Sequence, residues 1–478
     1  MGGLVFTSGI NPLHTPRMSP SVYRIMRERY SQILRQAFVI VATPIEGPAK
    51  KDFGDIDFFL MWLREDVFPL SKATSLTQLF FAQKGANVSN GLLEMVTSLL
   101  GGVRLKKQQS GVAAIAIPWP KDLLPQETAI DTNHDTLSND SPTQRYIQVD
   151  VHVCSSLHYL QWMLFKHAHG DLWNLLGSTI RPFGLTVDEV GMWIRIPEIE
   201  ALHRNKAKVL LTVEPTEILS FLGLKCDGAQ WEEPFGSMQE VFEYAATCRL
   251  FWVRPHTTDN DAADDWDGTA DKCKLKSNDR RRMNHRPLFR QWIDEFIPQC
   301  RASGRFTTGP AATTTRAQVR DEAFAAFPGV EREYFARLRE WRVQCQRERL
   351  WRDVIKPALP TAEHEEPSDK SLHYRGCAAS ALKKIIMSDD RSFGIEPPGA
   401  SLRDGGGGGG DTALFDEDKV RAWVAAHWRE VGDAAWKRNH ALHAKKMKKD
   451  SGNANDDNDN NNTTTTKRTA SGCEKVEE

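Results

Sequence analysis

The sequence predicts an α+β protein that ends in a helical module, and three observations support this fold class. Short β-branched segments alternate with helical periodicities over residues 20–155. One segment, 146–154, alternates apolar and polar residues, and residues 284–356 have helical periodicity throughout. Because the chain has 478 residues, we expect two or three domains.

The composition is that of an intracellular protein without a general charge bias. Charged residues make up 26% and the net charge is −1, which excludes a global attraction to nucleic acid or acidic membranes. The eight cysteines form no CxxC pair, which favours a reducing compartment. Since the sequence has no apolar run of about 18 residues and no signal-peptide pattern, we expect a cytoplasmic or nuclear protein without a membrane partner.

The first elements expected are a helix, a strand, a loop and a second strand. Ser19 before Pro20 is a favourable helix start, and apolar residues continue at helical spacing. The segment 37–44, "AFVIVATP", is short, β-branched and ended by proline, as in a buried strand. The polar loop "IEGPAKKDFG" then leads to a strand that begins at Asp55 with "DIDFFL".

Two further strands are expected before residue 155. Residues 71–101 have helical periodicity, and 111–118, "GVAAIAIP", has the composition of a buried strand. In 146–154, "YIQVDVHVC", the apolar residues share one face and Asp150 lies on the other. We expect these two strands to pair as a hairpin whose polar insertion, 120–145, is exposed and disordered.

The following hundred or so residues are expected to combine helices with short strands. An aromatic-rich helical stretch occupies 155–178, and Thr186 with Glu189 has the spacing of a capping box, which indicates a helix start. The sequence "KVLLTVEPTEILSFLGL" reads as strand, turn and helix. Ser237 and Glu240 are predicted to open another helix.

Composition divides the rest of the chain. A segment that changes from acidic to basic without periodicity precedes the helical region, and "DGGGGGGD" is a flexible spacer because no GK[ST] follows it. We therefore expect a first domain at 18–255, a loop or linker at 256–283, a helical module at 284–400, a glycine-rich linker at 401–411, an amphipathic helical region at 412–445 and a disordered tail at 446–478.

Two carboxylates separated by one residue indicate a site that needs positive charge. On a strand, Asp55 and Asp57 share a face and lie about 7 Å apart. Two negative charges at about 7 Å repel by roughly 2 kcal/mol at an effective dielectric of about 20. Either basic side chains such as Lys50, Lys51 or Arg64 offset this repulsion, or a pair of divalent cations does.

The order of these elements resembles the DNA polymerase beta-like nucleotidyltransferase superfamily, of the template-independent type. Its members carry a helix, a strand, a glycine-containing loop, a strand with the pattern hDhDh and a later strand with hDh. The matching pieces are the 20–36 helix, "FVIVAT", "EGPAKKDFG", "GDIDFFL" and "QVDVHV". The resemblance covers about residues 20–155 and implies a mixed sheet flanked by helices.

The resemblance implies a two-metal site. Asp55 and Asp57 would bridge two Mg²⁺ ions, and Asp150 would complete the site that holds the attacking hydroxyl. The ions would clamp the triphosphate of a nucleoside triphosphate and stabilise in-line attack on its α-phosphorus, with pyrophosphate leaving.

The resemblance also implies a set of nucleotide-binding residues. Gly47 would let the triphosphate approach the backbone, and Lys50 or Lys51 would supply positive charge. Trp173 and Asn174 follow the third carboxylate on an expected helix, where family members often build the base pocket. For Trp173, burial in the core is the alternative.

The implied function is transfer of a nucleoside monophosphate from an NTP to a hydroxyl acceptor, which is an RNA 3′ end, a protein hydroxyl or a small molecule. The chain lacks the Gly-Ser or Gly-Gly pair of active members and carries Glu46 in the loop. The alternative is a catalytically degenerate nucleotidyltransferase-fold protein that binds RNA or a protein partner. Neither hypothesis specifies an oligomeric state.

Other polar clusters have simpler interpretations. His152 shares a face with Asp150 and is either a phosphate or metal contact or a polar neighbour. His167 and His169 match no established zinc spacing. The basic residues within 330–356 form either an RNA-facing surface or a solvated helix face. Those within 437–449 bind nucleic acid, act as a nuclear localisation signal, or do neither.

Overall fold

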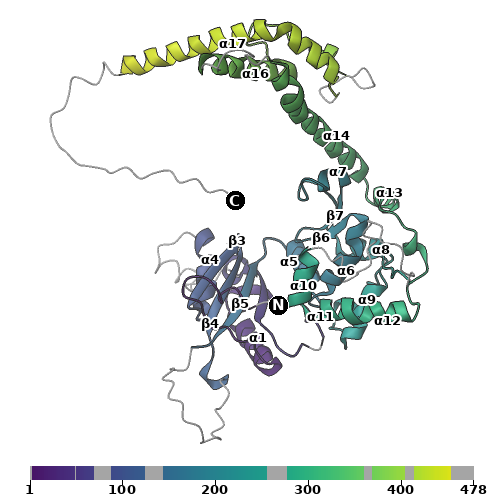
Figure 1. Cartoon of the computed structure of the whole chain (residues 1–478). Coiled ribbons are helices and arrows are strands. Elements are labelled where there is room, and N and C mark those ends of the chain that lie inside the picture. The colour runs from purple at the N-terminus through teal and green to yellow at the C-terminus, as the bar shows by residue number, and fades with distance from the viewer. Residues whose placement is uncertain are drawn as a thin grey trace, which may run out of the picture. The chain divides into compact units, whose positions relative to one another are not determined.

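The structure is a computed structural model that describes residues 3–48, 50–68, 88–123, 144–255, 277–359, 369–403 and 414–453 (Figure 1). The chain divides into two compact units, Met1–Tyr334 and Phe335–Glu478. Much of several predicted segments lies outside the described residues: the helical segment 71–101, the insertion 120–145, the linker 256–283, the glycine-rich linker 401–411 and the tail 446–478.

The first unit has the predicted α+β fold, built on a mixed five-stranded sheet of order β1-β2-β5-β4-β3. β2 pairs with β5 in parallel, and the other neighbouring pairs are antiparallel. The strands are β1 (Phe38–Ala42), β2 (Asp55–Leu63), β3 (Arg104–Gln109), β4 (Val112–Pro118) and β5 (Tyr146–Val153). The predicted hairpin of β4 and β5 is confirmed, whereas β3 was missed because "RLKKQQ" is a polar edge strand without apolar alternation.

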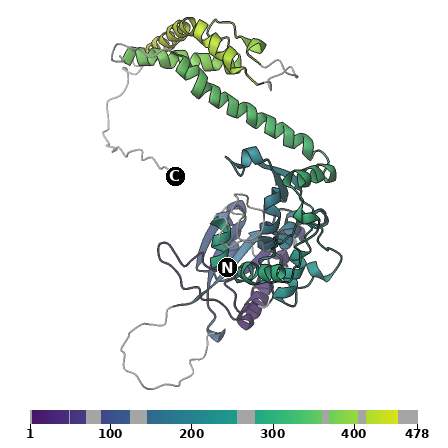
Figure 2. The same cartoon turned by 45° about the vertical axis from the view of Figure 1, so that its right-hand side comes forward.

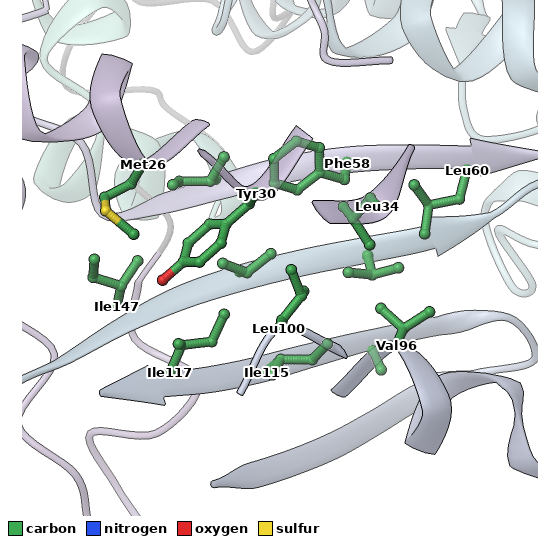
Figure 3. Close-up of a cluster of buried hydrophobic side chains, with 14 of the residues drawn as sticks. Met26, Tyr30, Leu34, Phe58, Leu60, Val96, Leu100, Ile115, Ile117 and Ile147 are labelled. Atoms are coloured by element: carbon green, nitrogen blue, oxygen red, sulfur yellow. The ribbon is translucent and has the colours of Figure 1, made fainter. Parts of the chain in front are cut away.

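One face of this sheet forms the core under α1 (Pro20–Leu34) and α4 (Val88–Leu99). Ser19 caps α1 as predicted, because its side chain accepts from the Val22 amide. Figure 3 shows Met26, Tyr30 and Leu34 of α1 packed against apolar side chains of β2, β4 and β5. The strand alternation therefore turns the intervening polar residues to the opposite face.

A second part of this unit contains a three-stranded antiparallel sheet and helices. Its strands are β6 (Leu185–Val187), β7 (Met192–Arg195) and β8 (Lys208–Thr212); its helices include α5 (Leu157–His167), α6 (Leu172–Ile180), α7 (Pro197–Glu200), α8 (Pro215–Leu222) and α9 (Met238–Ala246). The strand, turn and helix predicted at β8 and α8 are confirmed, as is the helix start at Ser237.

The capping box predicted at Thr186 and Glu189 is wrong, because Thr186 lies within β6. A tight turn closes the hairpin to β7: the Asp188 amide donates to the Gly191 carbonyl, and the Asp188 side chain accepts from the Val190 amide. Strand pairing and this aspartate turn override the local capping pattern.

Helices dominate from residue 277 onward. They are α10 (Ser277–His285), α11 (Pro287–Gln291), α12 (Ile297–Ala302), α13 (Arg316–Ala326), α14 (Val330–Arg349), α15 (Lys356–Ala358), α16 (Asp369–Ser388) and α17 (Glu417–Asn453); short elements elsewhere include α2 (Arg64–Val67) and the 3-10 turns at Lys121–Leu123, Arg181–Phe183, Ala229–Trp231, Pro310–Ala312 and Gly399–Leu402. π-helical turns at Trp292–Phe296 and Leu350–Ile355 precede α12 and α15. No described helix is both long and apolar enough to cross a membrane.

Two helices extend beyond the predicted limits. α10 covers the end of the expected linker, where the buried Asp279 carboxylate accepts from Arg181 and Arg282 and so anchors the helix. α17 continues to Asn453, past the expected end at residue 445, through a lysine-rich stretch of good helix formers. In the second unit, α16 and α17 lie side by side in both views and share an apolar core (Figures 1 and 2).

Candidate functional site

The polar face of the five-stranded sheet brings the three predicted carboxylates together. In the parallel pair of β2 and β5, Asp57 is the register partner of Asp150, and Asp55 is the partner of Gln148. Neighbouring strands lie about 4.8 Å apart, so Asp57 and Asp150 are side by side on one face. Ile56, between Asp55 and Asp57 in the sequence, points to the other face and belongs to the core. Residues distant in sequence thus form one acidic cluster.

Burial and mutual repulsion perturb this cluster. Burial, followed by the charges of Asp55 and Asp150, holds the pKa of Asp57 well above its usual range. Burial and the charge of Asp55 raise the pKa of Asp150 to about 7. Burial also raises the pKa of Asp55, while Lys50 acts in the opposite direction. Without an added cation, the site therefore resists carrying three full negative charges.

The donor chemistry of this face fits magnesium. Carboxylate oxygens are preferred ligands of Mg²⁺, and a divalent charge would stabilise the ionised forms that repulsion disfavours. Among the described residues, no group of three or more His, Cys, Asp or Glu side chains is arranged to hold one metal ion. The donor types of this face therefore suit Mg²⁺, whereas the three side chains as they stand do not converge on one position; Asp55, Asp57 and Asp150 are the residues that would hold the ions.

The loop between β1 and β2 adds one acid and one base beside the cluster. Lys50 Nζ lies 2.5 Å from Glu46 Oε2, and the Tyr23 hydroxyl donates to the other carboxylate oxygen of Glu46. Burial, Asp55 and Asp150 are the larger causes of the raised pKa of Asp57. The charge of Glu46 raises this pKa further, and Lys50 lowers it. The loop is held to α1 because the Phe53 ring stacks on Tyr23 at a centroid distance of 3.8 Å. The carboxylate partner of Lys50 in this structure is Glu46.

The two other predicted loop residues lie in different surroundings. A Cβ on Gly47 would lie 3.4 Å from the carbonyl oxygen of His169, which is an ordinary contact. The packing of the protein does not itself demand glycine at this position. Lys51 is exposed.

The two residues predicted for a base pocket lie in an aromatic cluster. Trp173 is 7% exposed, and its indole N–H donates to the Phe165 carbonyl at 3.2 Å. Its ring packs near Phe165 and Trp231, with centroid distances of 5.1 and 6.5 Å. The Asn174 amide donates to Asp171. Trp173 is therefore buried in the core, which was the alternative to a base pocket. Among the described residues, neither Trp173 nor Asn174 forms a hydrogen bond with Asp55, Asp57 or Asp150.

The predicted histidines are packing residues in this structure. The His152 ring lies 4.8 Å from Phe59 and 5.7 Å from His167, and burial followed by the charge of His167 lowers the pKa of His152 to about 4. His167 lies 3.8 Å from Glu189. His169 is fully buried in the aromatic cluster, apart from the other two. Burial lowers the pKa of both His152 and His169, so packing explains these two positions, whereas His167 lies beside Glu189.

The alternation of β5 places Gln148 on this face, but sequence reasoning gave this residue no role. It is 1% exposed, and its amide donates to Asp150 Oδ1 at 2.9 Å. The strict alternation of β5 contained the signal, because a polar residue two positions before Asp150 shares its face. The other partner of Gln148, the Val5 amide, is too distant in sequence to be inferred from a pattern.

No family model matches this chain, and no curated protein matches it.

Proposed function

We propose that the first unit is a magnesium-dependent nucleotidyltransferase that transfers a nucleoside monophosphate from an NTP to a hydroxyl acceptor. One observation carries the proposal: Asp57 and Asp150 are register partners on adjacent parallel strands, with Asp55 on the same face. A loop that contains Gly47, Lys50 and Lys51 precedes this face, although it lacks the Gly-Ser or Gly-Gly pair that active members of the nucleotidyltransferase superfamily carry.

The residues have distinct roles in this proposal. Two Mg²⁺ ions held by the three aspartates would polarise the triphosphate and neutralise charge on the leaving pyrophosphate. Lys50, released from Glu46, contacts the triphosphate, and Gly47 leaves room for its approach. Asp150, on the strand beside Asp57, would complete the site that holds the acceptor hydroxyl and would take up its proton.

The test is pyrophosphate release from labelled nucleoside triphosphates with magnesium. Asp57→Asn removes the central carboxylate of the cluster and is expected to lower the rate at least about a thousandfold, because no other residue in the cluster replaces it. Asp227→Asn, at an exposed loop position of the same unit, serves as the matched control and should retain full activity. Equal rates in wild type and Asp57→Asn would contradict the proposal.

A non-catalytic binding protein is the second candidate, favoured by the ion pair that occupies Lys50 and by the burial of Trp173. Such a protein would retain RNA or a protein partner without magnesium and would release no pyrophosphate. Asp57→Asn would leave this retention unchanged. The same assay, run with and without magnesium beside a filter-retention measurement, separates the two functions.

A further inference from the structure

The N-terminal segment 3–18 packs on the polar face of the sheet. Phe6 is 2% exposed and packs with Ala114 and Ala116 of β4, which are the register neighbours of Asp150 and Gln148. The two alanines leave space that the phenylalanine ring fills. The segment is thus part of the surroundings of the carboxylates.

Several contacts hold this segment in place. The Leu13 amide donates to the Phe6 carbonyl at 2.8 Å, and the Thr15 hydroxyl donates to the Gly3 carbonyl at 2.8 Å. Gly3 has a φ of 87° and lies directly against Gly54; a Cβ there would lie 2.3 Å from the Gly54 carbonyl oxygen. Gly54 immediately precedes the first carboxylate. The position of Val5 between Gly3 and Phe6 is therefore well defined.

The Val5 amide determines the orientation of the Gln148 side chain. Val5 N donates to Gln148 Oε1 at 3.1 Å. Because a backbone N–H can only donate, the amide oxygen of Gln148 must face Val5 and its NH₂ group must face the other way. That NH₂ group donates to Asp150 Oδ1 at 2.9 Å. The amide cannot turn over without losing both hydrogen bonds, so it presents a donor to Asp150.

From this chain of contacts we propose that Gln148, held by the N-terminal segment, is a positioning residue for Asp150. The hydrogen bond occupies Oδ1 and leaves Oδ2 for a metal ion or an acceptor hydroxyl. This inference rests on the proposed function, since it gives Asp150 a metal to bind.

The test measures the affinity of the full chain for Mn²⁺ by calorimetry. Gln148→Met keeps the length of the side chain but donates no hydrogen bond, and the dissociation constant is expected to rise about tenfold to a hundredfold, as for other residues that orient metal ligands. Phe6→Ala, which loosens the segment, should raise it in the same direction by about threefold. Ile10→Ala alters a residue of the same segment that is 94% exposed, and should change nothing.

A double variant tests whether Gln148 acts through Asp150. In an Asp150→Asn background, Gln148→Met should cause no further loss of Mn²⁺ affinity, because the group that it positions is already altered. Wild-type affinity in folded Gln148→Met, or full additivity in the double variant, would overturn the inference. Should Gln148→Met fail to fold, wild-type affinity in Phe6→Ala would overturn it. A wild-type chain that binds no Mn²⁺ would instead refute the proposed function, and the inference with it.

Discussion

The two faces of the five-stranded sheet use the same strands in opposite ways. On one face, Ile56 and Phe58 are fully buried against α1. On the other, Asp55 and Asp57 are partly buried beside Asp150. Burying a large apolar side chain contributes about 1.5 to 3 kcal/mol to stability, whereas like charges at short distance cost stability.

This difference separates residues that hold the fold together from residues that would act in it. The apolar face explains why the sheet forms, and it needs no carboxylates. The polar face concentrates acids that destabilise one another, an arrangement that proteins retain chiefly at functional sites. Mutations on the two faces should therefore have opposite consequences for stability and for ligand binding.

The largest expected effect is on the apolar face. Phe58→Ala should lower the free energy of unfolding by about 3 to 5 kcal/mol, because it removes a fully buried ring and leaves a cavity. Phe68→Ala is the matched control at a ring that is 56% exposed, and it should cost less than about 1 kcal/mol. Denaturant unfolding measures both values. Similar losses at the two positions would contradict the core assigned to this face.

On the polar face, stability should fall as the pH rises. The pKa of Asp150 is about 7 in the folded chain, and the unfolded value is about 3.9, so between these values the folded chain holds a proton that the unfolded chain has lost. Stability is therefore highest below this window and falls through it by about 4 kcal/mol for this group, because each pKa unit corresponds to about 1.4 kcal/mol. Asp150→Asn should reduce the fall, measured as the free energy of unfolding at pH 4, 5.5 and 7.

The exposed control for this titration is Asp227→Asn, which should keep the wild-type pH profile. Saturating Mg²⁺ should oppose the fall in the wild type, since a bound cation favours ionised carboxylates. A profile that rises from pH 4 to 7 and loses its slope in Asp150→Asn would show that this carboxylate is stabilised in its ionised form, contrary to the site described.

The comparison of the two faces also shows what sequence patterns can predict. β-branched composition predicts most strands of the sheet, and the Ser19 cap predicts the start of α1. The alternation of β5 predicts the face on which Asp150 lies. These signals are local, and each follows from the spacing of side chains on a single element. The edge strand β3 gave no such signal because its residues are polar and largely exposed.

Pairings between distant segments were beyond sequence reasoning from the residues alone. Nothing in 55–63 or 146–153 specifies that these strands lie side by side in parallel, which is what joins Asp57 to Asp150. The sequence around Trp173 is compatible with both a core position and a base pocket. Only the contacts of its ring in the folded chain distinguish these two positions. The contact of Val5 with Gln148 likewise depends on the folded chain.

The smallest expected effect concerns Glu46, at the edge of the polar face. Its ion pair with Lys50 is partly exposed and contributes about 0.5 kcal/mol, so Glu46→Gln should change the free energy of unfolding by less than about 1 kcal/mol. The same substitution removes a negative charge from the acidic cluster and releases Lys50. On the proposed function, the affinity for a nucleoside triphosphate with magnesium should rise about fivefold, or about 1 kcal/mol.

Fluorescence titration with a labelled nucleoside triphosphate measures this change, and Glu28→Gln, at an exposed position of α1, is the matched control. The glutamine at position 46 can still accept from the Tyr23 hydroxyl, so the loop keeps its attachment to α1. Tighter binding in Glu46→Gln alone would show that Glu46 competes with phosphate for Lys50. Weaker or unchanged binding would mean that Lys50 serves the loop and not the ligand, which would favour the non-catalytic alternative.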